Sequence, residues 1–265
     1  MVEKAVISPL FLEGACAKRE STVGPSFLFR LILWSWVISL VLNSGIPLPS
    51  FAQEVFLPSS IQRVTVPILG TTLNRHWEQI GVVAEVQIQF ELRPDHNGLR
   101  VLFQKTPGRF SPLAQQAVQQ AIREVVKVGN VDPDSWTVTL TLPYQGLTMY
   151  GESLSGMVGL CVLALARGDA LPRGRVLTGT ITPTGQIGMV GGIPLKIEAA
   201  FQRNLHKVII PEEIDVADGD WSTPFLMVIS PVGTIKKAYR ALTDRSLEFP
   251  PSKQAISAFA SHNLR

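Results

Sequence analysis

A serine and a lysine stand 43 residues apart in this chain, and each has neighbours that could make it reactive. Ser153 belongs to the string GESLS at residues 151–155, and Lys196 follows the string VGGIPL at residues 190–195. A serine hydroxyl is a poor nucleophile until a neighbouring base takes its proton. A lysine held uncharged in an apolar pocket can be that base. The two residues are therefore candidates for a nucleophile and its general base.

Ser153 also has an ordinary interpretation as a helix N-cap, because an apolar run at residues 154–166 predicts a buried helix directly after it. The start of a helix suits catalysis as well, since the N–H groups of the first turn can stabilise a developing oxyanion. The string nearly matches the Gly-x-Ser-x-Gly elbow of hydrolases but has Ser155 at its last position. Ser155 is a rival nucleophile that lies deeper in the predicted helix.

Lys196 would ordinarily be a solvated lysine on a helix surface. Here Leu195 and Ile197 flank it, and Ala199 and Ala200 follow at helical spacing. Two glycines and a proline precede it, so it belongs to the first turns of the predicted helix. Apolar surroundings and the positive end of a helix both disfavour the ammonium form and lower the pKa of a lysine.

Thr178 lies between the two candidates, in the string TGTITPTG at residues 178–185. A threonine in a strand is common and usually has no chemical role. Its hydroxyl could instead orient the lysine amine. The paired glycines at residues 191–192 form a tight turn or allow a substrate backbone to approach closely.

Helical and strand patterns interleave from about residue 62 to residue 245, which predicts a single α+β domain. Strands are expected at residues 65–70, 86–92, 99–103, 136–142, 177–182, 186–190, 207–210 and 225–230, with a turn at residues 94–98 that returns the chain. Helices are expected at residues 112–129, 154–166, 195–204 and 234–242, the first of them capped by Ser111.

The composition excludes several classes of function. The chain is 46% hydrophobic and 17% charged, so it can bury a core and is not disordered. A net charge of +3 without a dense basic run argues against nucleic acid as a partner. Two cysteines, Cys16 and Cys161, and four histidines form no metal-ligand pattern. No cofactor or metal is therefore expected.

The first 52 residues predict a targeting segment. The apolar run RLILWSWVISLVL at residues 30–42 follows basic residues, and small residues precede a cut between Ala52 and Gln53. This pattern predicts a signal peptide and export. The alternative is an uncleaved membrane anchor at residues 27–42, although the run is shorter than the roughly 20 residues that span a bilayer. The remaining chain divides into an extension at 53–79, a domain at 80–245 and a tail at 246–265.

Residues 142–211 resemble the proteolytic domain of Lon-type serine proteases, without a gap. The match consists of Pro143, Ser153 in its Gly-x-Ser context, Thr178-Gly179-x-Ile181-Thr182, Gly185, Val190-Gly191-Gly192, Lys196 and Val208-Ile209-Ile210-Pro211. The string GESLS is more similar to the Gly-Asp-Ser-Ala-Ser variant of archaeal Lon than to the Pro-Ser-Ala-Gly variant of bacterial Lon.

The resemblance implies a Lon-type domain of mixed β-sheets with packed helices at residues 80–245. It implies hydrolysis of peptide bonds in unfolded or flexible polypeptides by a Ser–Lys dyad. Ser153 would be the nucleophile, Lys196 the general base and Thr178 a support for the lysine. Domains of this type often form rings of identical chains, and the sequence itself leaves the oligomeric state open.

The chain departs from the family pattern at three points. Tyr150 replaces an acidic residue that many members carry three positions before the serine, and Leu154 replaces the small residue after it. The 265 residues contain no Gly-x-x-x-x-Gly-Lys-Ser/Thr loop, so cleavage without ATP is expected. The alternative is a catalytically inactive Lon-like pseudoprotease that binds or scaffolds peptides. A hydrolase with a histidine base is a weaker third hypothesis.

Overall fold

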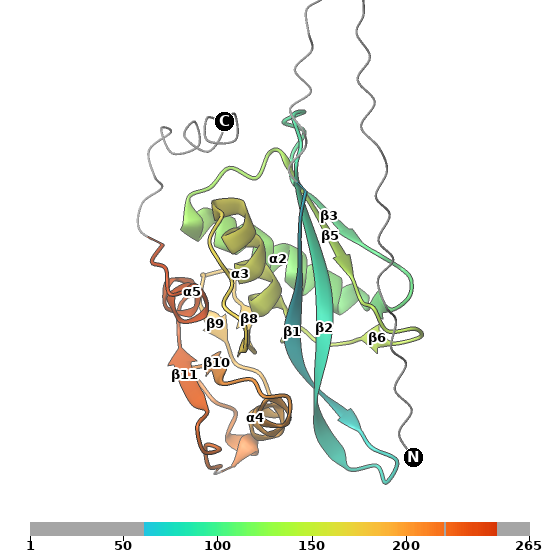
Figure 1. The fold of residues 1–265 in the computed structure, drawn as a ribbon, viewed down its shortest axis with the longest axis vertical. Coiled ribbons are helices and arrows are strands. Elements are labelled where there is room, and N and C mark those ends of the chain that lie inside the picture. Colours follow the sequence, from blue (N-terminus) through green and yellow to red (C-terminus); the bar gives the residue numbers. More distant parts are fainter. Residues whose placement is uncertain (1–60, 220, 248–265) are drawn as a thin grey trace, which may run out of the picture. The chain divides into compact units, whose positions relative to one another are not determined.

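The structure is a computed structural model that describes residues 61–219 and 221–247 (Figure 1). The predicted anchor at residues 27–42, the cut at Ala52 and nearly all of the predicted tail lie outside the described residues. Among the helices that are described, none combines the length and the apolarity needed to cross a bilayer.

Helices and strands alternate along the described chain, and the expected α+β class is confirmed. In chain order the elements are β1 (Ile61–Leu73), β2 (Gln79–Leu92), β3 (Arg100–Phe103), β4 (Arg109–Phe110), α2 (Pro112–Gly129), β5 (Trp136–Thr141), β6 (Thr148–Met149), α3 (Ser155–Arg167), β7 (Arg175–Leu177), β8 (Thr180–Ile181), β9 (Ile187–Gly188), α4 (Ile193–Gln202), β10 (Lys207–Pro211), the 3₁₀-helix η1 (Val216–Asp218), β11 (Val228–Val232) and α5 (Ile235–Thr243).

Two sheets organise the domain. The larger has the strand order β1-β2-β5-β3, and the smaller is parallel with the order β11-β10-β7. β1 and β2 form a long antiparallel pair from Ile61 opposite Glu91 to Leu73 opposite Gln79. Figure 1 shows this pair as a twisted ribbon with α2 and α3 beside it and α4 near its lower half. β1 is an edge strand of the larger sheet.

The structure extends one expectation about this sheet and corrects another. β1 includes the strand expected at residues 65–70 but is longer, and it lies within residues 53–79, which the sequence assigned to an extension. β3 does not return against β2, because it pairs in parallel with β5. Arg93, which follows β2, donates to Trp136 O at 2.8 Å and to Gly98 O at 2.6 Å. These bonds link the end of β2 to the start of β5 and to the turn before β3.

The main core lies between the larger sheet and the helices α2 and α3. The α2 helix begins as predicted, with Ser111 accepting a hydrogen bond from Ala114 N at 3.2 Å. The first ten residues of α3 are all buried, as its apolar sequence predicts. A Cβ atom at Gly159 would lie 3.2 Å from Ala121 Cβ, so this glycine lets α2 and α3 cross closely.

A second, smaller core holds α4 in place. Ile193 and Ile197 of α4 pack with Leu69 of β1 and Val208 of β10. The backbone of β2 also approaches α4 closely, because a Cβ atom at Gly81 would overlap Leu195 O. The helix that carries Lys196 is therefore fixed against the β1–β2 pair.

Candidate active site

Ser153 lies in the turn between β6 and α3 and is half-buried. The N-cap of α3 is Leu154, and no side chain caps this helix end. The interpretation of Ser153 as an N-cap is therefore wrong, and its hydroxyl is not used for capping. The turn that presents it includes Gly151 with φ 87°, a left-handed conformation that favours glycine.

Backbone hydrogen bonds join this turn to the segment that carries Thr178. Ser153 O accepts from Gly179 N at 3.0 Å, and Gly179 O accepts from Gly156 N at 3.0 Å. Thr178 N in turn donates to Ile209 O of β10 at 3.0 Å. The smaller sheet thus sets the position of both the threonine and the turn of the candidate nucleophile.

Some N–H groups of the first turn of α3, which were expected to form an oxyanion site, already donate hydrogen bonds to other backbone groups. Ser155 N donates to Glu152 O at 2.9 Å, and Gly156 N is taken up by Gly179 O. Within the described part of the chain, the N–H groups of Ser153 and Leu154 have no backbone acceptor. These two amides lie at the candidate nucleophile and are therefore candidates to stabilise a negative oxygen.

Thr178 is fully buried, and its Oγ1 has no hydrogen-bond partner among residues 61–219 and 221–247. The hydroxyl of Ser155, a residue that is 1% exposed, also has no hydrogen-bond partner in the described structure. A buried hydroxyl without a partner costs roughly 1–3 kcal/mol. Ser155 is too deeply enclosed to act as the rival nucleophile. The Thr178 hydroxyl is available to an amine or to a water molecule.

Lys196 is 4% exposed and lies one turn into α4, where its N–H donates to Gly192 O at 3.0 Å. Burial lowers the pKa of this lysine from 10.5 to about 8, although the nearby Asp218 carboxylate acts in the opposite direction. The apolar neighbours seen in the sequence account for the burial. A substantial fraction of the amine is therefore uncharged at mildly alkaline pH.

Ser153 and Lys196 both line one cavity of about 410 Å³. Residues 68–72 of β1 and residues 147–151 before the serine form much of its wall, and Leu154 lines it as well. No hydrogen bond links Ser153 Oγ to Lys196 Nζ in the described structure. Both residues therefore line the same cavity without a direct hydrogen bond between them.

Two departures from the family pattern lie at this cavity. Tyr150 lines it and is 74% exposed, so its ring stands towards solvent. Leu154 is 2% exposed and packs in the main core. None of the described histidines lines the cavity; His96, for example, pairs with the Ser135 hydroxyl at 3.0 Å in a distant turn.

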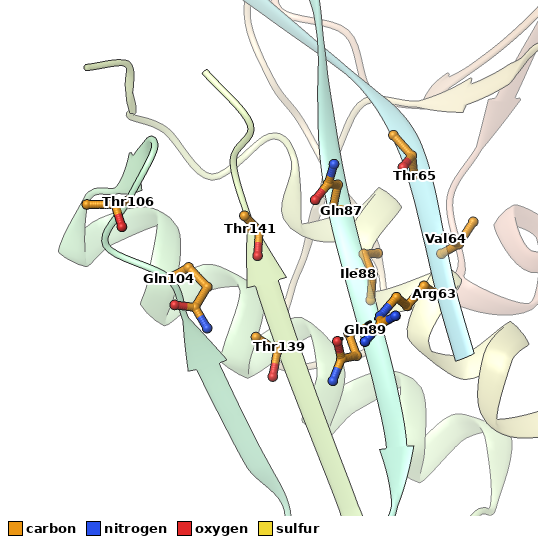
Figure 2. Close-up of a pocket in the computed structure, with 10 residues that line it drawn as sticks. All are labelled: Arg63, Val64, Thr65, Gln87, Ile88, Gln89, Gln104, Thr106, Thr139 and Thr141. Atoms are coloured by element: carbon orange, nitrogen blue, oxygen red, sulfur yellow. Dashed lines mark hydrogen bonds between the residues drawn. The ribbon is translucent and has the colours of Figure 1, made fainter. Parts of the chain in front are cut away.

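A larger hollow of about 510 Å³ lies on the four-stranded sheet (Figure 2). Figure 2 shows threonine and glutamine side chains from neighbouring strands around it, with Arg63 as the charged residue. The Arg63 guanidinium donates a hydrogen bond from Nε to Gln89 Oε1 at 3.0 Å. No general base faces its threonines, so the smaller cavity is the better candidate for hydrolysis.

Over the described residues, no group of three His, Cys, Asp or Glu side chains could hold a metal ion.

Sequence reasoning missed Asp218. Its carboxylate oxygens accept hydrogen bonds from Gly192 N at 2.8 Å and Ile193 N at 3.1 Å, at the start of α4. It is also the charged group that acts on Lys196. No spacing rule connects residues so far apart, and the local string DVADG at 215–219 signals only a turn.

A buried amine and a half-buried serine facing one cavity define a candidate hydrolase site of the Ser–Lys class. Residues 115–219 match the family model of the Lon protease (S16) C-terminal proteolytic domain, and this range contains the candidate residues Ser153, Thr178, Lys196 and Asp218. The resemblance to the proteolytic domain of Lon-type serine proteases that the sequence indicated is therefore confirmed over residues 115–219.

Curated relatives carry the same family name. The archaeal Lon protease of Archaeoglobus fulgidus is 31% identical over 108 residues, which is 40% of this chain and 17% of the relative. The Lon protease of Fervidobacterium nodosum is 23% identical over 175 residues, 63% of this chain and 21% of the relative. The archaeal Lon protease of Thermoplasma acidophilum is 27% identical over 138 residues, 51% of this chain and 20% of the relative. The chain thus spans about a fifth of the length of these proteins.

Proposed function

We propose that the domain is a serine endopeptidase that cleaves unfolded or flexible polypeptides with a Ser153–Lys196 dyad and without ATP. One observation carries the proposal. A lysine with a pKa of about 8, far below the ordinary 10.5, faces the same cavity as a serine whose hydroxyl caps no helix. A general base works best when its pKa lies near the working pH.

In the proposed reaction, the uncharged Lys196 amine takes the proton of Ser153 Oγ as the oxygen attacks the carbonyl carbon of the substrate. The resulting oxyanion is stabilised by the free N–H groups of Ser153 and Leu154. The Lys196 ammonium then gives its proton to the leaving amine, and an acyl-serine remains. Water attacks the acyl group with Lys196 again as base, which releases the carboxylate and restores the serine. Thr178 Oγ1 has no partner in the described structure, and in this reaction it would accept a hydrogen bond from the Lys196 ammonium and hold it towards Ser153.

The edge strand supports a polypeptide as the substrate class. Residues 68–72 of β1 line the cavity, and β1 pairs along one side only, with β2. An extended peptide can add to such an edge through main-chain hydrogen bonds. This mode of binding requires an unfolded or flexible segment, because a folded chain has its backbone groups already paired.

The competing hypothesis is a pseudoprotease that binds peptides in the same cavity. The absence of a Ser153–Lys196 hydrogen bond in the described structure favours it, as does Leu154 in place of a small residue. Casein digestion without ATP decides between the two, with the wild type compared with S153A and K196A. Active wild type and inactive variants support the peptidase. Three equally inert proteins, with no acyl-serine trapped by a fluorophosphonate, support the pseudoprotease.

We also propose that residues 1–52 direct export of the domain, with residues 27–42 as its anchor if the segment is retained. N-terminal sequencing of the mature protein tests this proposal, because a start at Gln53 requires cleavage after Ala52. Assembly into a ring of identical chains is a further proposal by analogy with the family. Sedimentation of the purified protein measures it directly.

A further inference from the structure

The start of α4 has no cap from its own segment. Its N-cap residue is Gly192, which has φ 72° and no side chain that could accept a hydrogen bond. The first N–H groups of a helix need partners from elsewhere when they are not solvated. Here Asp218 Oδ1 accepts from Gly192 N at 2.8 Å and Asp218 Oδ2 accepts from Ile193 N at 3.1 Å. Both oxygens of the Asp218 carboxylate, which comes from the β10–β11 connection, thus cap the N-terminus of α4.

The connection between β10 and β11 is shaped to present this carboxylate. It contains η1, whose N-cap Asp215 accepts from Ala217 N at 3.0 Å. Asp218 N donates to Asp215 O at 3.0 Å, and Gly219 follows with φ 62°. The position of Asp218 is therefore set by local hydrogen bonds and by a glycine conformation, independently of its bonds to α4.

The Asp218 carboxylate is close enough to the Lys196 amine for its charge to raise the pKa of that lysine, although the two form no ion pair in the described structure. Lys196 lies in the first turn of α4 after the residues that Asp218 caps, and the Asp218 charge acts on it. The cavity wall formed by β1, β2 and residues 147–154 contributes Tyr150 as its titratable side chain, and Tyr150 is exposed. Glu198, the acidic residue of α4 itself, is exposed and hydrogen-bonds to Gln202 at 2.9 Å. Among the described residues, Asp218 is therefore the charged group that opposes the effect of burial on the pKa of Lys196.

We propose that Asp218 is a positioning residue for the candidate base: it fixes the first turn of α4 and supplies the negative charge that keeps the Lys196 amine able to hold a proton. This inference rests on the proposed dyad and deepens it. A base that gives its proton to a leaving group must accept it first, and a lysine desolvated without compensation would accept it too weakly. The Asp218 carboxylate offsets part of the effect of desolvation on the pKa of Lys196.

The test measures the titration of Lys196 itself. The pH dependence of Lys196 acylation by acetic anhydride, followed by mass spectrometry, gives its pKa in the wild type, D218N and E213Q. Glu213 is an exposed carboxylate on the same connection and makes no side-chain hydrogen bond in the described structure, so E213Q is the matched control. We expect D218N to lower the pKa by about 0.5–1.5 units and E213Q to leave it unchanged. An unchanged pKa in a folded D218N would overturn the inference.

Two further measurements cover a D218N variant that does not fold. In the wild type, the amide protons of Gly192 and Ile193 should both be protected from exchange with solvent, because each donates to the Asp218 carboxylate. Amide protons that exchange freely contradict the cap. The variant D218E retains the charge and should return the Lys196 pKa towards its wild-type value.

These readouts separate the inference from the proposed function, because none of them requires peptide hydrolysis. A protein that shows the shifts and cleaves nothing refutes the peptidase and keeps the role of Asp218 in titration. A protein that cleaves casein while its lysine ignores D218N refutes the inference alone. In an active enzyme, the acid limb of the kcat/KM profile should move to lower pH in D218N by the same amount as the pKa.

Discussion

The carbonyl oxygen of Ser153 accepts a hydrogen bond from the backbone N–H of Gly179 at 3.0 Å. This bond joins the turn of the candidate nucleophile directly to the residue after Thr178. The same strand segment returns a bond to the start of α3 through Gly179 O and Gly156 N. The site is thus assembled by backbone pairing between segments that are distant in sequence, and its side chains follow from that pairing.

The close approach at Gly156 predicts the effect of adding one methyl group. A Cβ atom there would lie 2.6 Å from both Gly179 O and Leu177 Cδ2. We expect G156A to push the two segments apart and to lower the free energy of unfolding by about 1–3 kcal/mol. Urea unfolding measures the loss. Gly191 offers a control, because a Cβ atom there has 3.7 Å to its nearest neighbour and G191A should change stability little.

The buried hydroxyl of Thr178 predicts a separation of stability from activity. Its Oγ1 has no partner in the described structure, so T178V removes a group that contributes no hydrogen bond to the fold. We expect T178V to melt at or above the wild-type temperature and to lose about 10–100-fold in kcat/KM, whereas T178S keeps most of the activity. A T178V enzyme with full activity would show that the threonine does not orient the lysine.

The lowered pKa of Lys196 predicts how stability depends on pH. Because the pKa falls from 10.5 to about 8 on folding, the unfolded chain binds more protons than the folded chain between these values. The free energy of unfolding should therefore rise with pH from about 8 to 10.5, by up to about 3 kcal/mol in total. K196M lacks this rise. Parallel slopes for K196M and the wild type over this range would contradict the buried titration.

The same titration predicts the pH profile of the reaction. An uncharged amine is the active form of the base, so kcat/KM should increase with pH to a plateau, with its midpoint near 8. K196R keeps the positive charge but cannot lose its proton, and we expect it to be as inactive as K196A. Activity of K196R within tenfold of the wild type would exclude the lysine as base.

The candidate residues could be predicted from sequence because the signals around them are local. The apolar neighbours of Lys196 predict its burial, and the apolar run after Ser153 predicts a buried helix whose start faces the site. Asp218 could not be predicted, because it reaches Gly192 N and Ile193 N through space from another connection. Such a cap depends on the tertiary fold, and no spacing along the chain reveals it.

The sheet was harder to predict than the helices. In β1 the buried residues are Val66, Ile68 and Leu69, while most others are exposed or half-buried, so the strand lacks a regular alternation. The parallel pairing of β3 with β5 joins strands that are distant in sequence, as do the hydrogen bonds of Arg93 to Trp136 O. Several strands have only two residues, among them β6, β8 and β9. Strands this short are not recognised in the sequence by an alternation of apolar and polar residues.

The contact between Gly81 and Leu195 O has a mechanical consequence. Since the two backbones approach each other without an intervening side chain, we expect β2 and α4 to move together as one unit. The strand partner of β2 forms a wall of the cavity, and α4 carries its amine. A movement of the β1–β2 pair would therefore change the width of the cavity and the position of the Lys196 amine together.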